Sequence, residues 1–231
     1  MIFSKESAVQ QINHLLHLYN GLSIESMHDT EIVLSGYFWV NRVARDYQLC
    51  KEYQVKIVIP LYSDELPYVI DIGNHIDESY PHRYTDGRLC LETDAAIRMH
   101  FLEGFNLEIW IRDFVEPYYF SYEYYQRYGL FPFGERAHYI EGIYQTYGEI
   151  FKEPEYEKVL LLMKFIRYGQ YRGHLPCPCG SGKKLRSCHG KYVKDFFTNN
   201  SMKIIIEKDY DFIKEEFVAY DEQRRNTKAS K

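Results

Sequence analysis

The sequence of 231 residues lacks several features that define whole classes of protein. No apolar run is long enough to span a bilayer, so we expect no membrane segment. The first residues have neither the apolar core nor the cleavage site of a signal peptide, and we expect a cytoplasmic protein. The formal net charge of −5 argues against a nucleic-acid partner bound through a generally basic surface. No Gly-rich loop that could cradle phosphates is present, so no nucleotide cofactor is expected.

What is present is the composition of a globular protein. Hydrophobic residues make up 45% of the chain and charged residues 26%, which is enough to bury a core. The length fits one main domain with an appendage. Aromatic residues reach 17%, with 23 Tyr, many of them between Tyr118 and Tyr147. Because a Tyr ring buries area while its hydroxyl needs a partner, this enrichment predicts a partly wet packing or interface surface.

The order of periodic patterns predicts an α+β fold. Apolar residues at three- and four-residue spacing indicate a helix over about 4–18. Asn106 is a suitable N-cap for a second helix over about 107–118. Between the two helices lie three runs rich in Val, Ile and aromatic residues, which predict an antiparallel meander: residues 31–40, 53–59 and 68–72.

The second half of the chain is predicted to be helical. Helical spacing restarts at Tyr139–Tyr147, and a polar junction at residues 152–154 separates it from the next helix. We therefore place a domain boundary near Phe151. The expected organisation is a main domain over 1–150, a connecting helix over 151–173, a cysteine-rich knuckle over 174–191 and a helical tail over 192–231.

The five cysteines form an odd, clustered set, which favours metal binding or catalysis over a disulfide framework. Three of them lie with a histidine inside thirteen residues: Cys177, Cys179, Cys188 and His189. Zinc takes four sulfur or nitrogen ligands, often as two close pairs joined by a turn. A closed site of this kind leaves no position for a substrate water, so we predict structural Zn²⁺. The alternative, four unrelated residues in a basic loop, does not explain the clustering.

The segment 174–191 resembles the SEC-C zinc-binding motif. That motif reads Cys-x-Cys, eight residues, then Cys followed by Cys or His, and all four ligand positions match here. The resemblance implies a structural zinc knuckle that serves as a partner-binding appendage. The basic residues Lys183, Lys184 and Arg186 suit either an acidic protein surface or a nucleic-acid backbone, and the residues alone leave that choice open.

A fourth cysteine, Cys90, follows the turn signal Asp86-Gly87. A two-residue turn there places Arg83 opposite Cys90 and brings His82 close. Side-chain alternation sends the flanking leucines into a core and the thiol outwards. The neighbouring arginines and histidine are expected to favour the thiolate, the form that attacks a carbonyl. A buried, unreactive cysteine in a short strand is the alternative, and the residues alone leave both open.

Residues around Cys90 resemble a ubiquitin-conjugating enzyme, which has the UBC fold. The family has a Pro-flanked β-meander, a His-Pro-Asn tripeptide and a Gly-x-Ile-Cys-Leu segment that carries the thioester cysteine. By this resemblance Cys90 takes the catalytic position, within a likeness that spans about 4–150. The matching segments are Ile59-Pro60, Glu65-Leu66-Pro67, Tyr80-Pro81-His82 and Gly87-Arg88-Leu89-Cys90-Leu91.

The chain departs from the family pattern at two points. His82 replaces the asparagine of the tripeptide, and its imidazole could donate a hydrogen bond to an oxyanion or act as a base toward an amine. The Trp usually found after the catalytic Cys is missing, which argues against docking to a ligase of the eukaryotic kind. With these departures the chain resembles the divergent bacterial members of the family that are encoded with antiviral defence or ubiquitin-like modification systems.

The resemblance implies a thioester-forming acyl carrier. Cys90 would accept a ubiquitin-like modifier from an activating enzyme, and an amine of a target protein would resolve the thioester with help from His82. The zinc tail would recruit the target or the activating enzyme. The alternative is a non-catalytic adaptor that binds a modifier or partner protein, with the zinc knuckle as a second binding surface. A nucleic-acid-associated zinc protein is a third reading that rests only on the basic residues near the knuckle.

Overall fold

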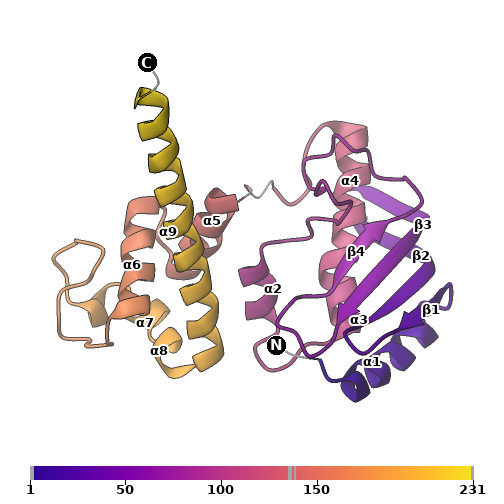
Figure 1. Cartoon of the computed structure of the whole chain (residues 1–231), viewed down its shortest axis with the longest axis horizontal. Helices are drawn as coiled ribbons and strands as arrows, with labels where there is room; N and C mark the ends of the chain where they lie inside the picture. Colours follow the sequence, from indigo (N-terminus) through magenta and orange to yellow (C-terminus); the bar gives the residue numbers. More distant parts are fainter. Residues whose placement is uncertain (1–2, 135–136, 138, 230–231) are drawn as a thin grey trace. The chain divides into compact units, whose positions relative to one another are not determined.

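The computed structural model describes residues 3–134, 137 and 139–229, with side chains of the last helix described up to Phe217. The chain forms two compact units (Figure 1). The N-terminal unit comprises Met1–Asp94 and Glu103–Glu135, and the C-terminal unit comprises Ala95–Leu102 and Arg136–Lys231. None of the helices in the described ranges has an apolar stretch of the length that a bilayer requires.

Helix α1, Lys5–Leu18, opens the N-terminal unit where the apolar spacing predicted it. The Ser4 hydroxyl caps it by accepting a hydrogen bond from the Ser7 N–H at 3.2 Å, which satisfies one of the free donors of the first turn. Its buried face is made of residues at three- and four-residue intervals: Ala8, Ile12 and Leu15.

A four-stranded sheet in the order β1-β2-β3-β4 forms the centre of this unit. Its strands are β1 (Leu22–Met27), β2 (Glu31–Ala44), β3 (Tyr47–Pro60) and β4 (Tyr68–Asp71), and every neighbouring pair is antiparallel. Helix α4, Glu116–Tyr128, lies along one face of the sheet (Figure 1). The predicted α+β class and antiparallel meander are therefore confirmed.

Two details of the sheet differ from the prediction. β2 and β3 run on to a two-residue turn at Arg45 and Asp46, which have φ of 52° and 60°. This is the left-handed backbone of a hairpin turn, but without the Asn-Gly or Asp-Gly pair that signals it in a sequence. Cys50 consequently lies within β3 and is exposed. β1 was not predicted, because four of its six residues are exposed and three of the six are polar.

Aromatic rings fill the space between the sheet and α4. The ring of Tyr119 stacks on Tyr53 at 4.1 Å between centroids and lies 5.8 Å from Phe38. The Tyr53 hydroxyl donates to the Glu123 carboxylate at 2.9 Å, so its polar end is satisfied while its ring is buried. Part of the tyrosine-rich stretch is thus core packing, although the buried Tyr119 hydroxyl has no hydrogen-bond partner among the described residues.

The helical stretch before Gly129 is interrupted by a π-helical turn. Helix α3 (Leu107–Trp110) starts at Asn106, whose side chain accepts the Ile109 N–H at 2.9 Å, as predicted. The π-helical turn, Ile111–Val115, then leads into α4 and its Pro117, a residue with no N–H to donate. Gly129, with φ of 68°, ends α4 in the left-handed conformation.

The C-terminal unit is helical. Its main helices enclose one hydrophobic core together with the short helix α2, Asp94–His100, which inserts from the middle of the chain. The other elements are α5 (Tyr139–Phe151), α6 (Tyr156–Tyr168), a 3₁₀ turn (Leu185–Ser187), α7 (Gly190–Val193), α8 (Asp195–Thr198) and α9 (Asn200–Ala229).

The division into units falls before α5 and not at the boundary expected near Phe151. Tyr144, Tyr147 and Phe151 of α5 are buried in the core of the C-terminal unit. The polar junction at residues 152–154 is therefore a turn between two helices of one core. A break in a helical pattern marks the end of a helix, and only the packing on either side shows whether a domain also ends there.

Candidate metal centre and candidate active site

Four side chains meet at one point of the C-terminal unit: Cys177, Cys179, Cys188 and His189. The His189 Nδ1 lies 3.4 Å from the Cys177 Sγ and 3.3 Å from the Cys188 Sγ, and the two sulfurs of Cys179 and Cys188 are 3.7 Å apart. A tetrahedron with metal–sulfur bonds of about 2.3 Å has ligand-to-ligand edges of roughly 3.5–3.8 Å. The cluster could therefore hold one metal ion.

The backbone of the knuckle folds back on itself to bring the donors together. The Cys177 N–H donates to the Lys183 carbonyl at 2.8 Å, which closes a tight loop between the two donor pairs. Gly180 and Gly182 lie in this loop with φ of 78° and 72°, a region that L-residues with a Cβ seldom adopt. These two glycines therefore allow the backbone to turn tightly after the first donor pair.

A carboxylate outside the motif supports the histidine donor. Glu153 follows the end of α5, and its Oε2 lies 3.4 Å from the His189 Nε2. Both residues are buried. Since Nε2 faces this carboxylate, the ring presents Nδ1 to the sulfurs, and such outer partners orient metal-binding histidines. Glu153 was not among the predicted residues, because it lies in the turn between α5 and α6 and belongs to no local spacing pattern.

Burial shapes the protonation of this cluster. It raises the pKa of the Cys177 thiol to about 11, and it lowers the pKa of His189, which favours the neutral imidazole that binds metals. Because a metal takes cysteine as the thiolate, an ion bound to Cys177 displaces a proton. Lys183 and Lys184 lie within the knuckle and are exposed, so they add positive charge to its surface.

The second candidate site is the Cys90 hairpin, which we define as residues 82–90. Its turn has three residues, Thr85-Asp86-Gly87, and not the two that were predicted. The Tyr84 N–H donates to the Arg88 carbonyl at 2.8 Å, and the Gly87 N–H donates to the Tyr84 carbonyl at 3.0 Å. Gly87 has φ of 85°, the left-handed position that completes a three-residue hairpin turn.

The three-residue turn shifts every cross-strand pair of the hairpin by one residue relative to the predicted pairing. Cys90 lies opposite His82, with the Cys90 N–H donating to the His82 carbonyl at 2.8 Å, while Arg83 pairs with Leu89. The expected pairing of Arg83 with Cys90 is therefore wrong, and the expected closeness of His82 and Cys90 holds. The hydroxyl of Tyr118, from α4, also donates to the His82 carbonyl at 3.0 Å.

The expectation that the surroundings of Cys90 favour the thiolate is wrong. Cys90 is half-buried, and burial is the main cause that raises the pKa of its thiol. The carboxylates of Glu92 and Asp94 raise this pKa further, and a hydrogen bond with Tyr84 lowers it only in part. The thiol is thus the form favoured at neutral pH.

The two arginines near Cys90 direct their charges elsewhere. Arg83 donates through Nη1 to the Ile76 carbonyl at 2.8 Å. The Nε of Arg88 lies 2.7 Å from the Asp86 carboxylate. Proximity in sequence suggested that both guanidinium groups act on the thiol, whereas the hairpin geometry gives each of them another acceptor.

The imidazole of His82 lies among aromatic rings. Its centroid is 5.5 Å from the ring of Tyr80 and 5.3 Å from that of Phe131. Tyr80 is itself buried and packs edge-on against Tyr122 of α4 at 5.0 Å. These contacts fix the tripeptide Tyr80-Pro81-His82 against the helix, so that the backbone beside Cys90 has a defined position.

Comparison with known families identifies the knuckle. Residues 175–191 match the SEC-C motif, and this range contains the four donors of the metal cluster. No curated protein and no solved structure matches the chain. The family match therefore covers the segment that carries the four candidate metal ligands, and it does not extend to the N-terminal unit.

Proposed function

We propose that the N-terminal unit is a UBC-like acyl carrier with Cys90 as its thioester residue. The observation that carries the proposal is the pairing of Cys90 with His82, which puts the thiol beside the tripeptide Tyr80-Pro81-His82. This hairpin follows a helix and a four-stranded antiparallel meander and precedes a long helix, which is the order that the resemblance implies.

The proposed reaction has two transfers. First, the Cys90 sulfur attacks the thioester that joins the modifier to an activating enzyme. A Cys90 S–C bond forms, the S–C bond of the activating enzyme breaks, and the Cys90 proton passes to the released thiol. Second, an amine of the target attacks the Cys90 thioester. A C–N bond forms, the Cys90 S–C bond breaks, and a proton from the amine returns to the sulfur.

Other side chains of the hairpin region have roles in this scheme. His82 donates a hydrogen bond to the oxyanion of the tetrahedral intermediate, or accepts the proton of the attacking amine. Glu92 and Asp94 act electrostatically on the Cys90 thiol. The same negative charges attract the protonated amine of a target lysine toward the thioester.

Intact-protein mass spectrometry without reductant tests the acyl carrier. Wild type, Cys90→Ser and Cys90→Ala are purified from cells that also express the neighbouring genes. We expect a modifier-sized mass addition on wild type, a more stable ester on Cys90→Ser and no addition on Cys90→Ala. Cys50→Ala is the matched control, since it removes an exposed thiol of β3 and should leave the addition unchanged.

One observation favours a second function, the non-catalytic adaptor. The raised pKa of the Cys90 thiol disfavours the nucleophilic thiolate at neutral pH, and a residue that only packs has no need of the thiolate. An adaptor would hold a modifier or partner protein on the UBC-like unit without forming a thioester. Absence of any mass addition in all variants, combined with co-purification of a partner that survives Cys90→Ala, would establish the adaptor and exclude the carrier.

For the metal cluster we propose structural Zn²⁺. Three sulfurs and one imidazole nitrogen, all within 4.8 Å of one another, suit zinc, and a four-donor site leaves no position for a substrate water. Elemental analysis should find one zinc per chain, and Cys179→Ser or Cys188→Ser should remove it. Cys50→Ala should retain it. Iron in place of zinc, or full zinc occupancy in both serine variants, would contradict this assignment.

The zinc knuckle is proposed to recruit an acidic surface of the target or activating enzyme. Residues 169–194 contain six Lys or Arg and no Asp or Glu, although the whole chain has a net charge of −5. Lys183, Lys184 and Arg186 are exposed. Charge reversal of these three residues should weaken partner capture. Binding of RNA or DNA with a steep salt dependence would instead support the nucleic-acid reading.

A further inference from the structure

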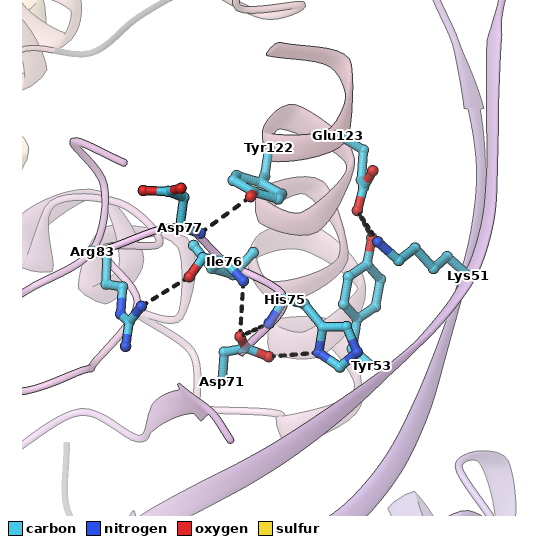
Figure 2. Close-up of polar contacts among 9 residues, drawn as sticks. All are labelled: Lys51, Tyr53, Asp71, His75, Ile76, Asp77, Arg83, Tyr122 and Glu123. Atoms are coloured by element: carbon cyan, nitrogen blue, oxygen red, sulfur yellow. Dashed lines mark hydrogen bonds and ion pairs between the residues drawn. The ribbon is translucent and has the colours of Figure 1, made fainter. Parts of the chain in front are cut away.

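The peptide around Ile76 is held by a buried carboxylate at the end of β4. The Asp71 Oδ2 accepts the His75 N–H at 2.6 Å and the Ile76 N–H at 2.9 Å, and its Oδ1 lies 3.1 Å from the His75 Nδ1 (Figure 2). Asp71 and Ile76 are both buried. Because an uncompensated carboxylate is costly to bury, these donors make Asp71 a fixed anchor for the segment.

The same peptide is held from two further elements. The Arg83 Nη1 donates to the Ile76 carbonyl at 2.8 Å, and the Asp77 N–H donates to the Tyr122 hydroxyl of α4 at 3.1 Å (Figure 2). Asp71 thus binds the amide side of Ile76 and Arg83 binds its carbonyl side. Through this one residue, the end of β4 is linked to the guanidinium of the Cys90 hairpin.

The Cys90 hairpin has a first strand, residues 82–84, and a second strand, residues 88–90, which carries Cys90. Arg83 anchors the first strand. The second strand is attached directly to β4, because the Leu89 N–H donates to the Val69 carbonyl at 2.9 Å and Arg88 bridges to Ile70. The first strand has no such place at the edge of β4. It is held by its pairing with the second strand, by Tyr118 on the His82 carbonyl and by the Arg83 side chain.

We propose that Asp71 and Arg83 are positioning residues that hold the first strand of the Cys90 hairpin in place through the Ile76 peptide. The inference rests on the proposed function for its consequence, transfer at Cys90, but the hairpin geometry can be tested without any modifier. Removing either side chain leaves a buried polar group of Ile76 without its acceptor or donor, so the segment has to rearrange.

Release of the first strand should make alkylation of the Cys90 thiol faster and acyl transfer at Cys90 slower. Burial is the main cause of the raised pKa of the Cys90 thiol, so a looser hairpin exposes the sulfur and brings its pKa down toward the ordinary value. Alkylation by a small reagent then becomes faster. Acyl transfer becomes slower, because it requires the thiol and the neighbouring backbone in one geometry.

The experiment measures iodoacetamide alkylation of Cys90 against pH in the full chain, in a Cys50→Ser background with zinc supplied. Asp71→Ala and Arg83→Met should each lower the midpoint of the pH profile. For a midpoint lower by about one pH unit, alkylation at neutral pH is about threefold faster, since the gain in thiolate is partly offset by its lower nucleophilicity. The double variant should change no more than either single variant.

Two further variants separate positioning from general destabilisation. Asp71→Asn keeps an acceptor for the two backbone N–H groups and should restore most of the wild-type profile. Glu78→Gln removes an exposed carboxylate of the same loop and should change nothing. If Asp71→Ala does not fold, Arg83→Met carries the test, with Arg83→Lys as its conservative counterpart, because this side chain is only half-buried.

The outcomes distinguish this inference from the proposed function. Unchanged alkylation profiles in Asp71→Ala and Arg83→Met, together with reduced stability, would overturn the inference and leave a merely structural role. If the profiles change as expected and wild type forms a thioester, the variants should lose transfer by on the order of tenfold or more. If the profiles change but wild type never carries an acyl group, the positioning role stands and the acyl carrier is excluded.

Discussion

Asp71 and Glu153 are the carboxylate residues buried within the described ranges, and each faces a histidine. The Asp71 Oδ1 lies 3.1 Å from the His75 Nδ1, and the Glu153 Oε2 lies 3.4 Å from the His189 Nε2. A buried carboxylate is stable only when donors or positive charge compensate it. Each of these two residues is accordingly part of a network that fixes a neighbouring segment, one at the Cys90 hairpin and one at the metal cluster.

Glu153→Gln tests the orienting role of this carboxylate at the metal cluster. The amide can keep the shape of the side chain but cannot supply the negative charge beside the His189 Nε2. We expect metal affinity to fall by about 10–100-fold, the usual effect of losing an outer partner of a metal-binding histidine. Competition with a chromophoric chelator measures it.

Glu155→Gln provides the matched control for that measurement. Its carboxylate is exposed and pairs with Lys158, and the residue lies two positions after Glu153 in the same turn. The control should bind metal as wild type does. Equal affinities for wild type and Glu153→Gln would mean that the carboxylate only fills space beside the ring.

At the scale of elements, both candidate sites lie on short turns rather than on regular strands or helices. The Cys90 hairpin turns at Gly87, and the knuckle turns at Gly180 and Gly182, all with positive φ. Such turns require little sequence beyond the glycine, so they are readable locally. The long helices and strands around them supply the buried surface against which the turns are fixed.

Two glycines of the N-terminal unit should respond differently to alanine. At Gly87 (φ 85°), an added Cβ would meet only the Ile70 side chain at 3.7 Å, so Gly87→Ala should cost about 1–2 kcal/mol from the backbone alone. At Gly36 (φ 142°), the Cβ would lie 2.1 Å from the Gly21 carbonyl oxygen. Gly36→Ala should therefore be the more destabilising change.

Urea unfolding followed by tryptophan fluorescence compares the two variants. Gly87→Asn is a useful third variant, because Asn tolerates the left-handed conformation better than Ala and should recover part of the loss. Equal costs at both positions would show that the strand around Gly36 shifts to accommodate the methyl group.

At the scale of the whole molecule, the two units differ in net charge and in tryptophan content. The N-terminal unit has 9 Lys or Arg and 20 Asp or Glu, a net charge of −11, whereas the C-terminal unit has 19 and 13, a net charge of +6. Both tryptophans, Trp39 and Trp110, belong to the N-terminal unit. Fluorescence therefore follows one unit, while most of the described helix belongs to the other.

Metal removal should separate the unfolding of the two units. Cys177 and Cys179 are part of the core of the C-terminal unit, so a chelator leaves buried thiols where a metal would join the two backbone segments 177–179 and 188–189. We expect the helical transition in far-UV circular dichroism to move down by on the order of 10 °C or more. The tryptophan transition should stay in place. A parallel shift of both signals would instead show that the units unfold together.

The local parts of both sites were predictable from the sequence. Asn106 caps its helix as predicted, because a cap acts on an N–H only three residues away. The four side chains of the Cys and His cluster lie within thirteen residues, so their spacing alone identified them as candidate metal ligands. His82 and Cys90 are near each other because a turn between them is short, even though its length was misjudged by one residue.

The non-local parts depend on packing. Glu153 reaches His189 only because helices from different parts of the chain are buried against one another. The same holds for α5, which packs into the C-terminal unit although its sequence pattern continues from the first half. Asp71 and Arg83 lie within thirteen residues of each other, but they meet at Ile76 through an irregular loop that no spacing pattern predicts.

The sequence by itself therefore determined the Asn106 cap, the antiparallel meander, the four candidate metal ligands and the presence of a turn before Cys90, since each depends mainly on neighbours a few residues apart. Only the tertiary structure decided the hairpin register, the protonated state favoured at Cys90, the outer partner of His189 and the limits of the two units. These depend on which surfaces are buried together, and burial sets both the strength of a hydrogen bond and the pKa of a thiol.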